Sequence, residues 1–121
     1  MEGTPGPAVL VVDDDASLRL LCRVNLELEG FVVRDAASAD EARDAVAEQR
    51  PDVVLLDVHL GGETTGGLLD ELHAAGIPVA LVTGSPDVDQ LRLRADDVLL
   101  KPFLPESLAA VARKLARVPD P

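Results

Sequence analysis

Asp57 stands where the sequence changes most sharply from apolar to polar residues. Four apolar residues, Val53 to Leu56, run directly into this carboxylate, and Gly61 and Gly62 follow soon afterwards. A short run of valine and leucine predicts a strand buried on both faces, as in a parallel sheet. A carboxylate is costly inside such a strand, but at its carboxyl end it lies where open α/β sheets bind ligands. The alternative is that Asp57 only caps a helix or binds a turn amide.

Further polar side chains stand at the ends of the other apolar runs. Asp13 and Asp14 follow the first run, Thr83 follows the fourth, and Lys101 follows the fifth. In a parallel sheet these positions lie along one edge, so three carboxylates, a hydroxyl and an ammonium group are expected to converge there. The alternative, that these groups stand at loop mouths by chance, requires the same coincidence at four strand ends.

Clustered carboxylates repel one another, and one of them would take up a proton unless a cation lies between them. Mg²⁺ binds one or two carboxylates, retains several waters and leaves room for phosphate oxygens. A carboxylate can itself be the nucleophile in phosphoryl transfer and form an aspartyl phosphate. Lys101 and Thr83 are the donors that a bound phosphoryl group would need. These residues therefore favour phosphoryl chemistry at a magnesium site.

The elements that would position these residues alternate along the chain. The apolar runs predict strands at 8–12, 31–34, 53–57, 78–82 and 98–100. The helical patterns predict helices at 17–29, 38–49, 66–75 and 105–118, with a short one at 87–94. Asp15 is expected to cap the first helix, and Ser38 with Glu41 forms a capping box for the second. This alternation predicts a doubly wound α/β domain with a parallel sheet and helices on both faces.

Length and composition narrow the function classes. A chain of 121 residues is one ordinary domain, and a net charge of −11 argues against binding nucleic acid. No run is long enough to span a membrane, and no signal segment opens the chain. The single cysteine, Cys22, cannot form an internal disulfide, and this cysteine usage favours the cytoplasm. Cys22 itself is interpreted as a small core residue. We expect a disordered lead at 1–7, one domain at 8–118 and a tail at 119–121.

Four motifs in this order resemble the receiver domain of bacterial two-component response regulators. They are VLVVDDD at 9–15, LLDVHLGG at 55–62, LVTG at 81–84 and DDVLLKPF at 96–103. The resemblance covers nearly the whole chain. It implies a five-stranded parallel sheet in the order 2-1-3-4-5, the flavodoxin-like arrangement.

The resemblance also implies the role of each residue at the metal site. Asp57 would be the phosphoacceptor and, with Asp14, would bind Mg²⁺ or another divalent cation such as Mn²⁺. Asp13 would act largely through water, and the backbone carbonyl of His59 would complete the protein's metal ligands. The His59 side chain is interpreted as a solvated loop imidazole, although its ring could border the path of attacking water.

The resemblance assigns the remaining site residues to the phosphoryl group. Thr83 would bond a phosphoryl oxygen on activation, Lys101 would pair with it, and the Lys101–Pro102 bond would be cis. A histidine kinase or a histidine phosphotransfer protein would be the donor. The domain would catalyse only its own phosphorylation and dephosphorylation. We expect a stand-alone regulator that signals through protein contacts or acts as a phosphate sink, although a receiver excised from a larger protein would have the same sequence.

Three departures from the family pattern limit what can be carried over. Val98 stands where an aromatic residue usually relays the movement of the threonine. The segment between Thr83 and Lys101 is short, which predicts a shortened fourth helix and a reduced dimer surface. Gly61 replaces the usual proline in the loop after Asp57. These changes leave the expected phosphorylation chemistry intact, but the family's usual output route cannot be carried over to this chain.

Two other interpretations remain open. An aspartate-nucleophile phosphohydrolase also forms an aspartyl phosphate, but such enzymes usually need a second aspartate two residues later, where this chain has His59. A degenerate receiver that signals without phosphate is the other. It is disfavoured because all five site residues are present.

The predicted first helix carries more apolar residues than one buried face needs. At 100° per residue, the arc containing Leu18, Cys22 and Leu26, with Leu21 beside it, would face the sheet. A second apolar row lies beyond this arc and consists of Leu20, Val24 and Leu28. Either the last helix covers this row through Leu108, Ala109 or Ala110, or the row is an exposed patch that binds a phosphodonor bundle or a second copy of the domain.

Overall fold

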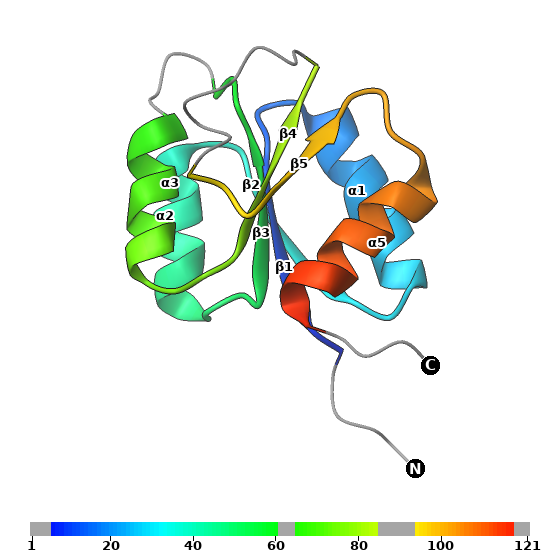
Figure 1. Ribbon diagram of the computed structural model, residues 1–121, viewed down its shortest axis with the longest axis horizontal. Helices are drawn as coiled ribbons and strands as arrows, with labels where there is room; N and C mark the ends of the chain where they lie inside the picture. The colour runs from blue at the N-terminus through cyan, green and yellow to red at the C-terminus, as the bar shows by residue number, and fades with distance from the viewer. Residues whose placement is uncertain (1–5, 61–64, 85–93, 118–121) are drawn as a thin grey trace.

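The computed structural model describes residues 6–60, 65–84 and 94–117, and a single five-stranded sheet runs through its centre (Figure 1). The strands are Ala8–Val12 (β1), Val32–Ala36 (β2), Val53–Asp57 (β3), Val79–Thr83 (β4) and Asp97–Leu100 (β5). The helices in this part of the chain are Ala16–Leu28 (α1), Ala39–Glu48 (α2), Thr65–Ala74 (α3) and Pro105–Ala116 (α5). None of these four helices is both long enough and apolar enough to cross a bilayer.

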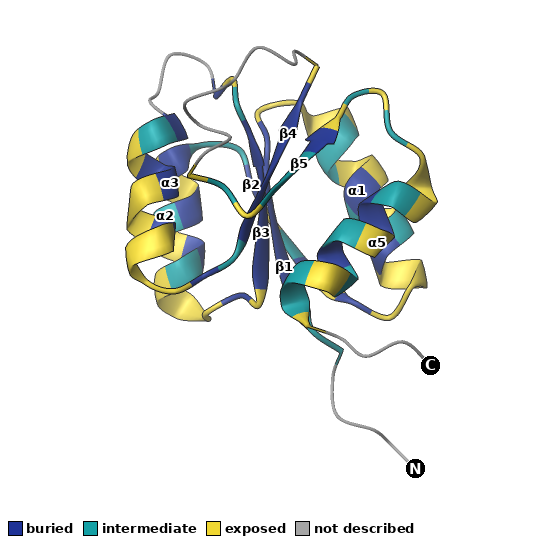
Figure 2. Cartoon of the chain, viewed as in Figure 1, coloured by how far each residue is buried: buried dark blue, intermediate teal, exposed yellow. Residues whose placement is uncertain are grey.

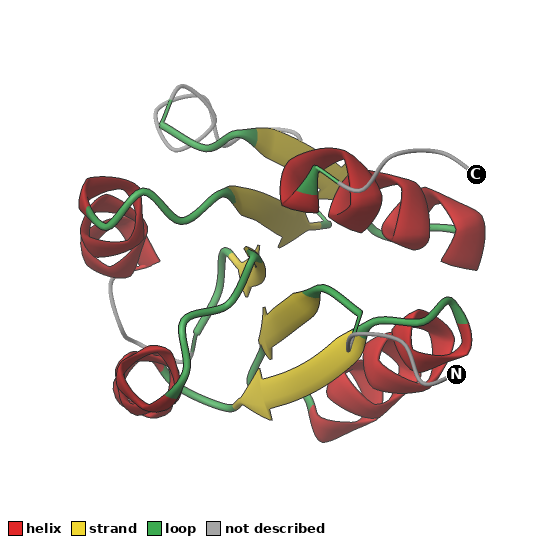
Figure 3. Cartoon of the chain, turned by 90° about the horizontal axis from the view of Figure 1, so that it is seen from below, coloured by secondary structure: helices red, strands yellow, loops and turns green. Residues whose placement is uncertain are grey.

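All strand pairs are parallel, and the order across the sheet is β2-β1-β3-β4-β5. The predicted order and the doubly wound α/β fold are therefore confirmed. α1 and α5 cover one face of the sheet, and α2 and α3 cover the other (Figures 1 and 3). Because both faces are covered, residues 53–56 of β3 are at most 1% exposed, and β3 and β4 are buried along their whole length (Figure 2). This is the environment that an unbroken apolar run predicts.

The core consists of two apolar clusters, one on each face of the sheet. Leu55 belongs to the cluster under α1 and α5, where it packs with Leu26. Leu56, the next residue, belongs to the cluster under α2 and α3 with Leu69. Adjacent side chains of a strand point to opposite faces, so β3 contributes to both clusters. The sheet edge that carries Asp57 is thereby fixed from both sides.

Local side-chain contacts start the first two helices where the sequence predicts. The Asp15 carboxylate accepts a hydrogen bond of 2.9 Å from the N–H of Ser17, at the start of α1. The Ser38 hydroxyl accepts from the N–H of Glu41 at 3.1 Å, and the Glu41 carboxylate accepts from the N–H of Ala37 at 2.9 Å. Both predicted caps are confirmed, and they satisfy N–H groups that no helix can pair internally.

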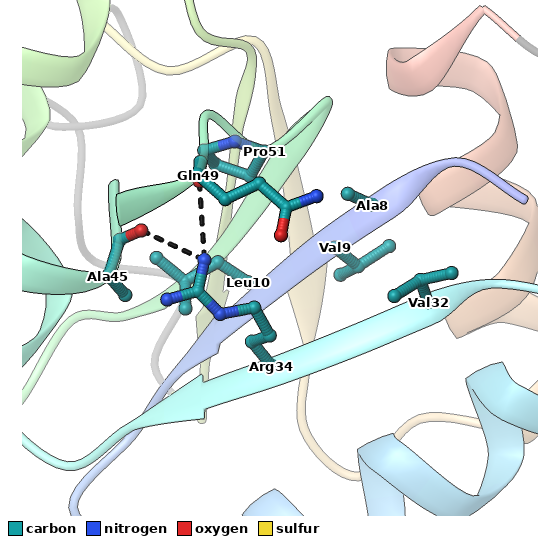
Figure 4. A pocket seen from close by; sticks show the side chains of 8 residues that line it. All are labelled: Ala8, Val9, Leu10, Val32, Arg34, Ala45, Gln49 and Pro51. Atoms are coloured by element: carbon teal, nitrogen blue, oxygen red, sulfur yellow. Dashed lines mark hydrogen bonds between the residues drawn. The ribbon is translucent and has the colours of Figure 1, made fainter. Parts of the chain in front are cut away.

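Glycines end α1 and α3, and a side chain from the sheet ends α2. Gly30 after α1 and Gly76 after α3 have φ values of 94° and 74°, which glycine adopts without steric cost. α2 ends differently, because Arg34 extends from β2 toward its last turn (Figure 4). The Arg34 guanidinium donates to the carbonyls of Ala45 at 2.9 Å and Gln49 at 3.3 Å. A cation thus neutralises the carboxyl end of α2.

The second strand differs from its predicted bounds of 31–34. Phe31 precedes β2 and is 5% exposed, and its N–H donates to the carbonyl of Leu26 at the end of α1. The strand continues to Ala36, which pairs with Val12 of β1. The strand continues through polar residues because β2 is the outermost strand on one side of the sheet, where polar side chains reach solvent.

The apolar surface of α1 also differs from one of the two expectations. Leu21 is 51% exposed, because the arc that faces the sheet is centred on Cys22 and Leu26. α5 packs against α1, but it leaves the second row uncovered, so coverage by the last helix is wrong. We call this row the α1 apolar row; its members are Leu20, Val24 and Leu28, with exposures of 61%, 47% and 78%.

Several predictions concern residues that lie wholly or mostly outside the described ranges. The short helix expected at 87–94, and with it the shortened fourth helix, lies outside the described residues except for its last residue. Most of the predicted disordered lead and all of the predicted tail, 119–121, also lie outside them. Within the lead, the carbonyl of Pro7 accepts a hydrogen bond from the N–H of Val32.

Candidate functional site

Polar side chains converge where the carboxyl ends of β1, β3, β4 and β5 meet. Asp13 and Asp14 directly follow β1, Asp57 ends β3, Thr83 ends β4 and Lys101 directly follows β5. Asp13, Asp14 and Asp57 each offer a carboxylate oxygen, and these oxygens all lie within 4.8 Å of one another. The residues that the sequence selects at separate strand ends are therefore brought together.

Asp13 is held rigidly although it lies in a loop. Its side chain is buried, and its Oδ1 accepts from the N–H of Asp15 at 2.9 Å. Its backbone N–H donates to the carbonyl of Ala36 at 3.0 Å, and its own carbonyl accepts from the guanidinium of Arg19 at 2.7 Å. Asp14, in contrast, is exposed. One carboxylate is thus anchored, while its neighbour faces the solvent from which a cation would arrive.

Asp57 is 5% exposed and shares this edge with a second buried carboxylate. Burial raises the pKa of Asp57, and the negative charge of Asp13 raises it further. The backbone N–H of His59 and the ammonium group of Lys101 oppose this rise, because both bind the charged form. The charged form of the Asp57 carboxylate is therefore disfavoured, and a further cation beside it would stabilise that form.

Lys101 is the cation that reaches both buried carboxylates. Its Nζ lies 3.4 Å from Oδ2 of Asp13 and 3.5 Å from Oδ1 of Asp57. Its backbone N–H donates to the carbonyl of Thr83 at 2.7 Å, which joins the ends of β4 and β5. The Lys101–Pro102 bond is cis, as the family resemblance implied.

Thr83 and His59 complete the predicted set. Thr83 is fully buried at the end of β4. The side chain of His59 is exposed, as expected for a loop imidazole, and its backbone N–H binds the Asp57 carboxylate. Cys22 lies beneath the site at 2% exposed, and burial together with Asp13 raises the pKa of its thiol to about 11. It is a neutral core residue, as predicted.

Two residues at this edge were missed by sequence reasoning. Arg19 of α1 holds the carbonyl of Asp13 and also pairs with Asp35 at 3.6 Å. Thr65, the first residue of α3, is buried and donates to the carbonyls of Asp57 and Val58. Both act on backbone atoms, and neither position has a spacing that marks it in the sequence.

The donor set fits a hard divalent cation. Three carboxylates supply only oxygen ligands, one of them is exposed to solvent, and the buried pair carries like charges that a cation would offset. Lys101 lies beside Asp57 and could donate hydrogen bonds to an anionic group. An exposed cation ligand, a buried carboxylate nucleophile and a nearby ammonium group are the components of phosphoryl transfer to an aspartate.

Comparisons with known proteins agree with this chemistry. A family model described as the response regulator receiver domain matches residues 9–113. The DNA-binding response regulator MtrA of Mycolicibacterium paratuberculosis is 39% identical over 117 residues, which cover 93% of this chain and 52% of that protein. The chain thus spans about half the length of this curated relative.

Solved structures give the same result. The receiver domain of NtrX from Brucella abortus superposes with a TM-score of 0.83 at 32% identity, covering 92% of this chain and 99% of that one. The chemotaxis protein CheY4 of Vibrio cholerae superposes with a TM-score of 0.83 at 28% identity, covering 91% and 98%.

Proposed function

The chain belongs to the response regulator receiver domain family, and from that membership we propose that it accepts a phosphoryl group on Asp57. The observation that carries the proposal is the position of this buried carboxylate between two further aspartates and one lysine. One carboxylate oxygen from each of Asp13, Asp14 and Asp57 lies within 4.8 Å of the other two. The Nζ atom of Lys101 lies 3.5 Å from Oδ1 of Asp57. A nucleophile, a cation site and an ammonium group that can donate hydrogen bonds to a phosphoryl group thus lie close together.

In the proposed reaction, an Asp57 carboxylate oxygen attacks the phosphorus of a phosphohistidine. The new O–P bond forms as the P–N bond breaks, and the leaving imidazole takes up a proton. Mg²⁺, or another divalent cation such as Mn²⁺, would be held by Asp14 and Asp57 directly, by Asp13 through water and by the carbonyl of His59. When bound, it would neutralise phosphate charge.

Lys101 and Thr83 have separate tasks in this proposal. Lys101 now divides its charge between two carboxylates, and it would follow the charge onto the phosphoryl oxygens when Asp57 is modified. The Thr83 hydroxyl would bond one of those oxygens, which moves the end of β4. Water later attacks the phosphorus of the acyl phosphate, which releases inorganic phosphate and returns Asp57 to its carboxylate form.

We infer that the module works in the cytoplasm as a signalling domain whose only chemistry is its own phosphorylation and dephosphorylation. The phosphoryl donor is a histidine kinase or a histidine phosphotransfer protein. The output is a protein contact, or the domain serves as a phosphate sink. The net charge of −11 supports a protein partner rather than nucleic acid.

The α1 apolar row is the proposed docking surface for the donor. Leu20, Val24 and Leu28 are exposed in a line along α1, and α1 begins one residue after Asp15, beside the acidic cluster. An exposed apolar row on a helix fits the apolar seam of a helical bundle. A second copy of the domain is the competing occupant of the same surface.

Intact mass measured after incubation with acetyl phosphate tests the proposed function. With Mg²⁺ present, the chain should gain the mass of one phosphoryl group, and EDTA should prevent the gain. No gain under either condition would refute it. Sustained turnover of a small phosphate ester would instead favour the phosphohydrolase, in which the domain acts on other substrates.

A further inference from the structure

Thr65 makes two contacts with the backbone that carries the acceptor. Its hydroxyl oxygen lies 2.8 Å from the carbonyl oxygen of Val58 and 3.2 Å from that of Asp57, and the residue is 4% exposed. Both partners are acceptors, so the single hydroxyl proton is donated mainly to Val58 and shared with Asp57. The hydroxyl is shielded from solvent, and water does not compete easily for these carbonyls.

The Val58 carbonyl and the His59 N–H belong to the same planar peptide group. That N–H lies beside the Asp57 carboxylate and opposes the rise of its pKa. Because the group is planar and trans, fixing the direction of its oxygen also fixes the direction of its N–H. A donor on the oxygen further polarises the peptide and strengthens its N–H as a donor. Thr65 therefore holds the backbone of Asp57 directly, and it fixes the direction of the His59 N–H through one intervening peptide.

The other strand ends at this edge are tied through neighbouring backbone. The N–H of Asp13 donates to Ala36 at 3.0 Å, and the N–H of Lys101 donates to Thr83 at 2.7 Å. The pairing of β3 with β4 ends at Asp57, so the Val58–His59 peptide lies beyond the ladder. Thr65 provides from α3 the support that a neighbouring strand provides elsewhere.

We propose that Thr65 is a positioning residue for phosphoryl transfer. By holding the carbonyls of Asp57 and Val58, it fixes the backbone at the end of β3, and with it the direction of the His59 N–H, so that the Asp57 carboxylate is placed for attack on the phosphorus. This inference rests on the proposed function, because it assigns a role within that reaction.

Thr65→Val tests this role, because valine keeps the shape of threonine and lacks the hydroxyl. With acetyl phosphate and saturating Mg²⁺, we expect Thr65→Val to be phosphorylated about tenfold more slowly than wild type, and Thr65→Ser to retain most of the rate. Ile77→Val is the matched control. Ile77 is 2% exposed. It precedes the amino end of β4, whereas the site lies at the carboxyl ends of the strands, so this change loosens the core without touching the site.

The amide proton of His59 provides a second readout, which a general loss of stability does not produce. Its chemical shift should change in Thr65→Val and stay at the wild-type value in Thr65→Ser and Ile77→Val. If Thr65→Val does not fold, Thr65→Ala supplies the hydroxyl-free variant. A wild-type rate with an unchanged His59 amide in the hydroxyl-free variant would overturn the role of Thr65. An unreactive wild type would instead refute the proposed function.

Discussion

Replacing Val24 and Leu28 of the α1 apolar row by glutamate tests whether this exposed row is the docking surface for the phosphoryl donor. Val24 is 47% exposed and Leu28 is 78% exposed, so only part of each side chain is buried in the folded domain. Complete burial of such side chains contributes about 1.5–3 kcal/mol. The buried fractions, about half for Val24 and about a fifth for Leu28, therefore place the stability cost of the double variant near 1–2 kcal/mol. A domain of ordinary stability remains folded after that loss.

The effect on a docked complex should be larger than the effect on the fold. If both side chains are buried against a helical bundle, losing about 1.4 kcal/mol at each slows transfer from a phosphohistidine donor about 100-fold under subsaturating conditions. Acetyl phosphate needs no docking surface, so its rate should stay within about twofold of wild type. The assay measures both rates on the same preparation. Its control, Ala47→Glu with Ala74→Glu, adds the same charge at exposed positions on α2 and α3.

Three results would refute this reasoning. Equal falls in both rates with a lowered melting temperature would mean that the substitutions act through the fold and not through docking. Unchanged rates from both donors would mean that the donor docks elsewhere. A wild-type dimer in sedimentation that becomes a monomer in the double variant, with transfer unaffected, would assign the row to a second copy of the domain.

The other predictions concern Asp57, Arg34 and Val98. The pKa of Asp57 is raised above the ordinary value of 3.8, so the folded state binds its proton more readily than the unfolded state. The metal-free domain should therefore gain stability from this group as the pH falls from neutral toward 3.8, and urea titrations of Asp57→Asn should lack that contribution. A parallel pH profile in Asp57→Asn would contradict this. Arg34→Met should cost about 1–2 kcal/mol and speed hydrogen exchange in the last turn of α2, because two carbonyls lose a charged donor; Arg23→Met, which breaks an exposed pair, should cost less than about 0.5 kcal/mol. Since Val98 provides no ring to relay movement, a beryllofluoride phosphoryl mimic should shift amide signals around Thr83 more than those of β5. Shifts centred on Val98 with a quiet Thr83 would be evidence against that route.

The sheet and the acidic cluster were predictable because they follow from strong physical constraints. A run such as Val53–Leu56 can be buried on both faces only within a covered parallel sheet, which fixes the layer order once the helices alternate with the strands. Parallel strands place their carboxyl ends at one edge, so Asp13, Asp57 and Lys101 had to meet. Their approach depends on topology and is insensitive to the exact ends of each element.

The missed features depend on contacts that no sequence period encodes. Thr65 and Arg19 bind backbone carbonyls. Threonine and arginine also occur commonly on exposed turns of helices, so neither residue type marks a buried contact. The exposure of Leu21 depends on how α1 rotates against the sheet, which a 100° wheel locates only to about one residue. The extension of β2 to Ala36 was missed because its polar residues favour a loop locally, whereas pairing with β1 decides the outcome.

Identifying the residue that carries the phosphoryl group tests most directly whether Asp57 is the acceptor. Borohydride reduces an aspartyl phosphate to homoserine, which tandem mass spectrometry locates within a peptide. After treatment with acetyl phosphate and Mg²⁺, homoserine should occur at position 57 alone and should be absent from Asp57→Asn and from samples that contain EDTA. Homoserine at position 13 or 14, or at no position, would contradict the assignment of Asp57 as the phosphoacceptor.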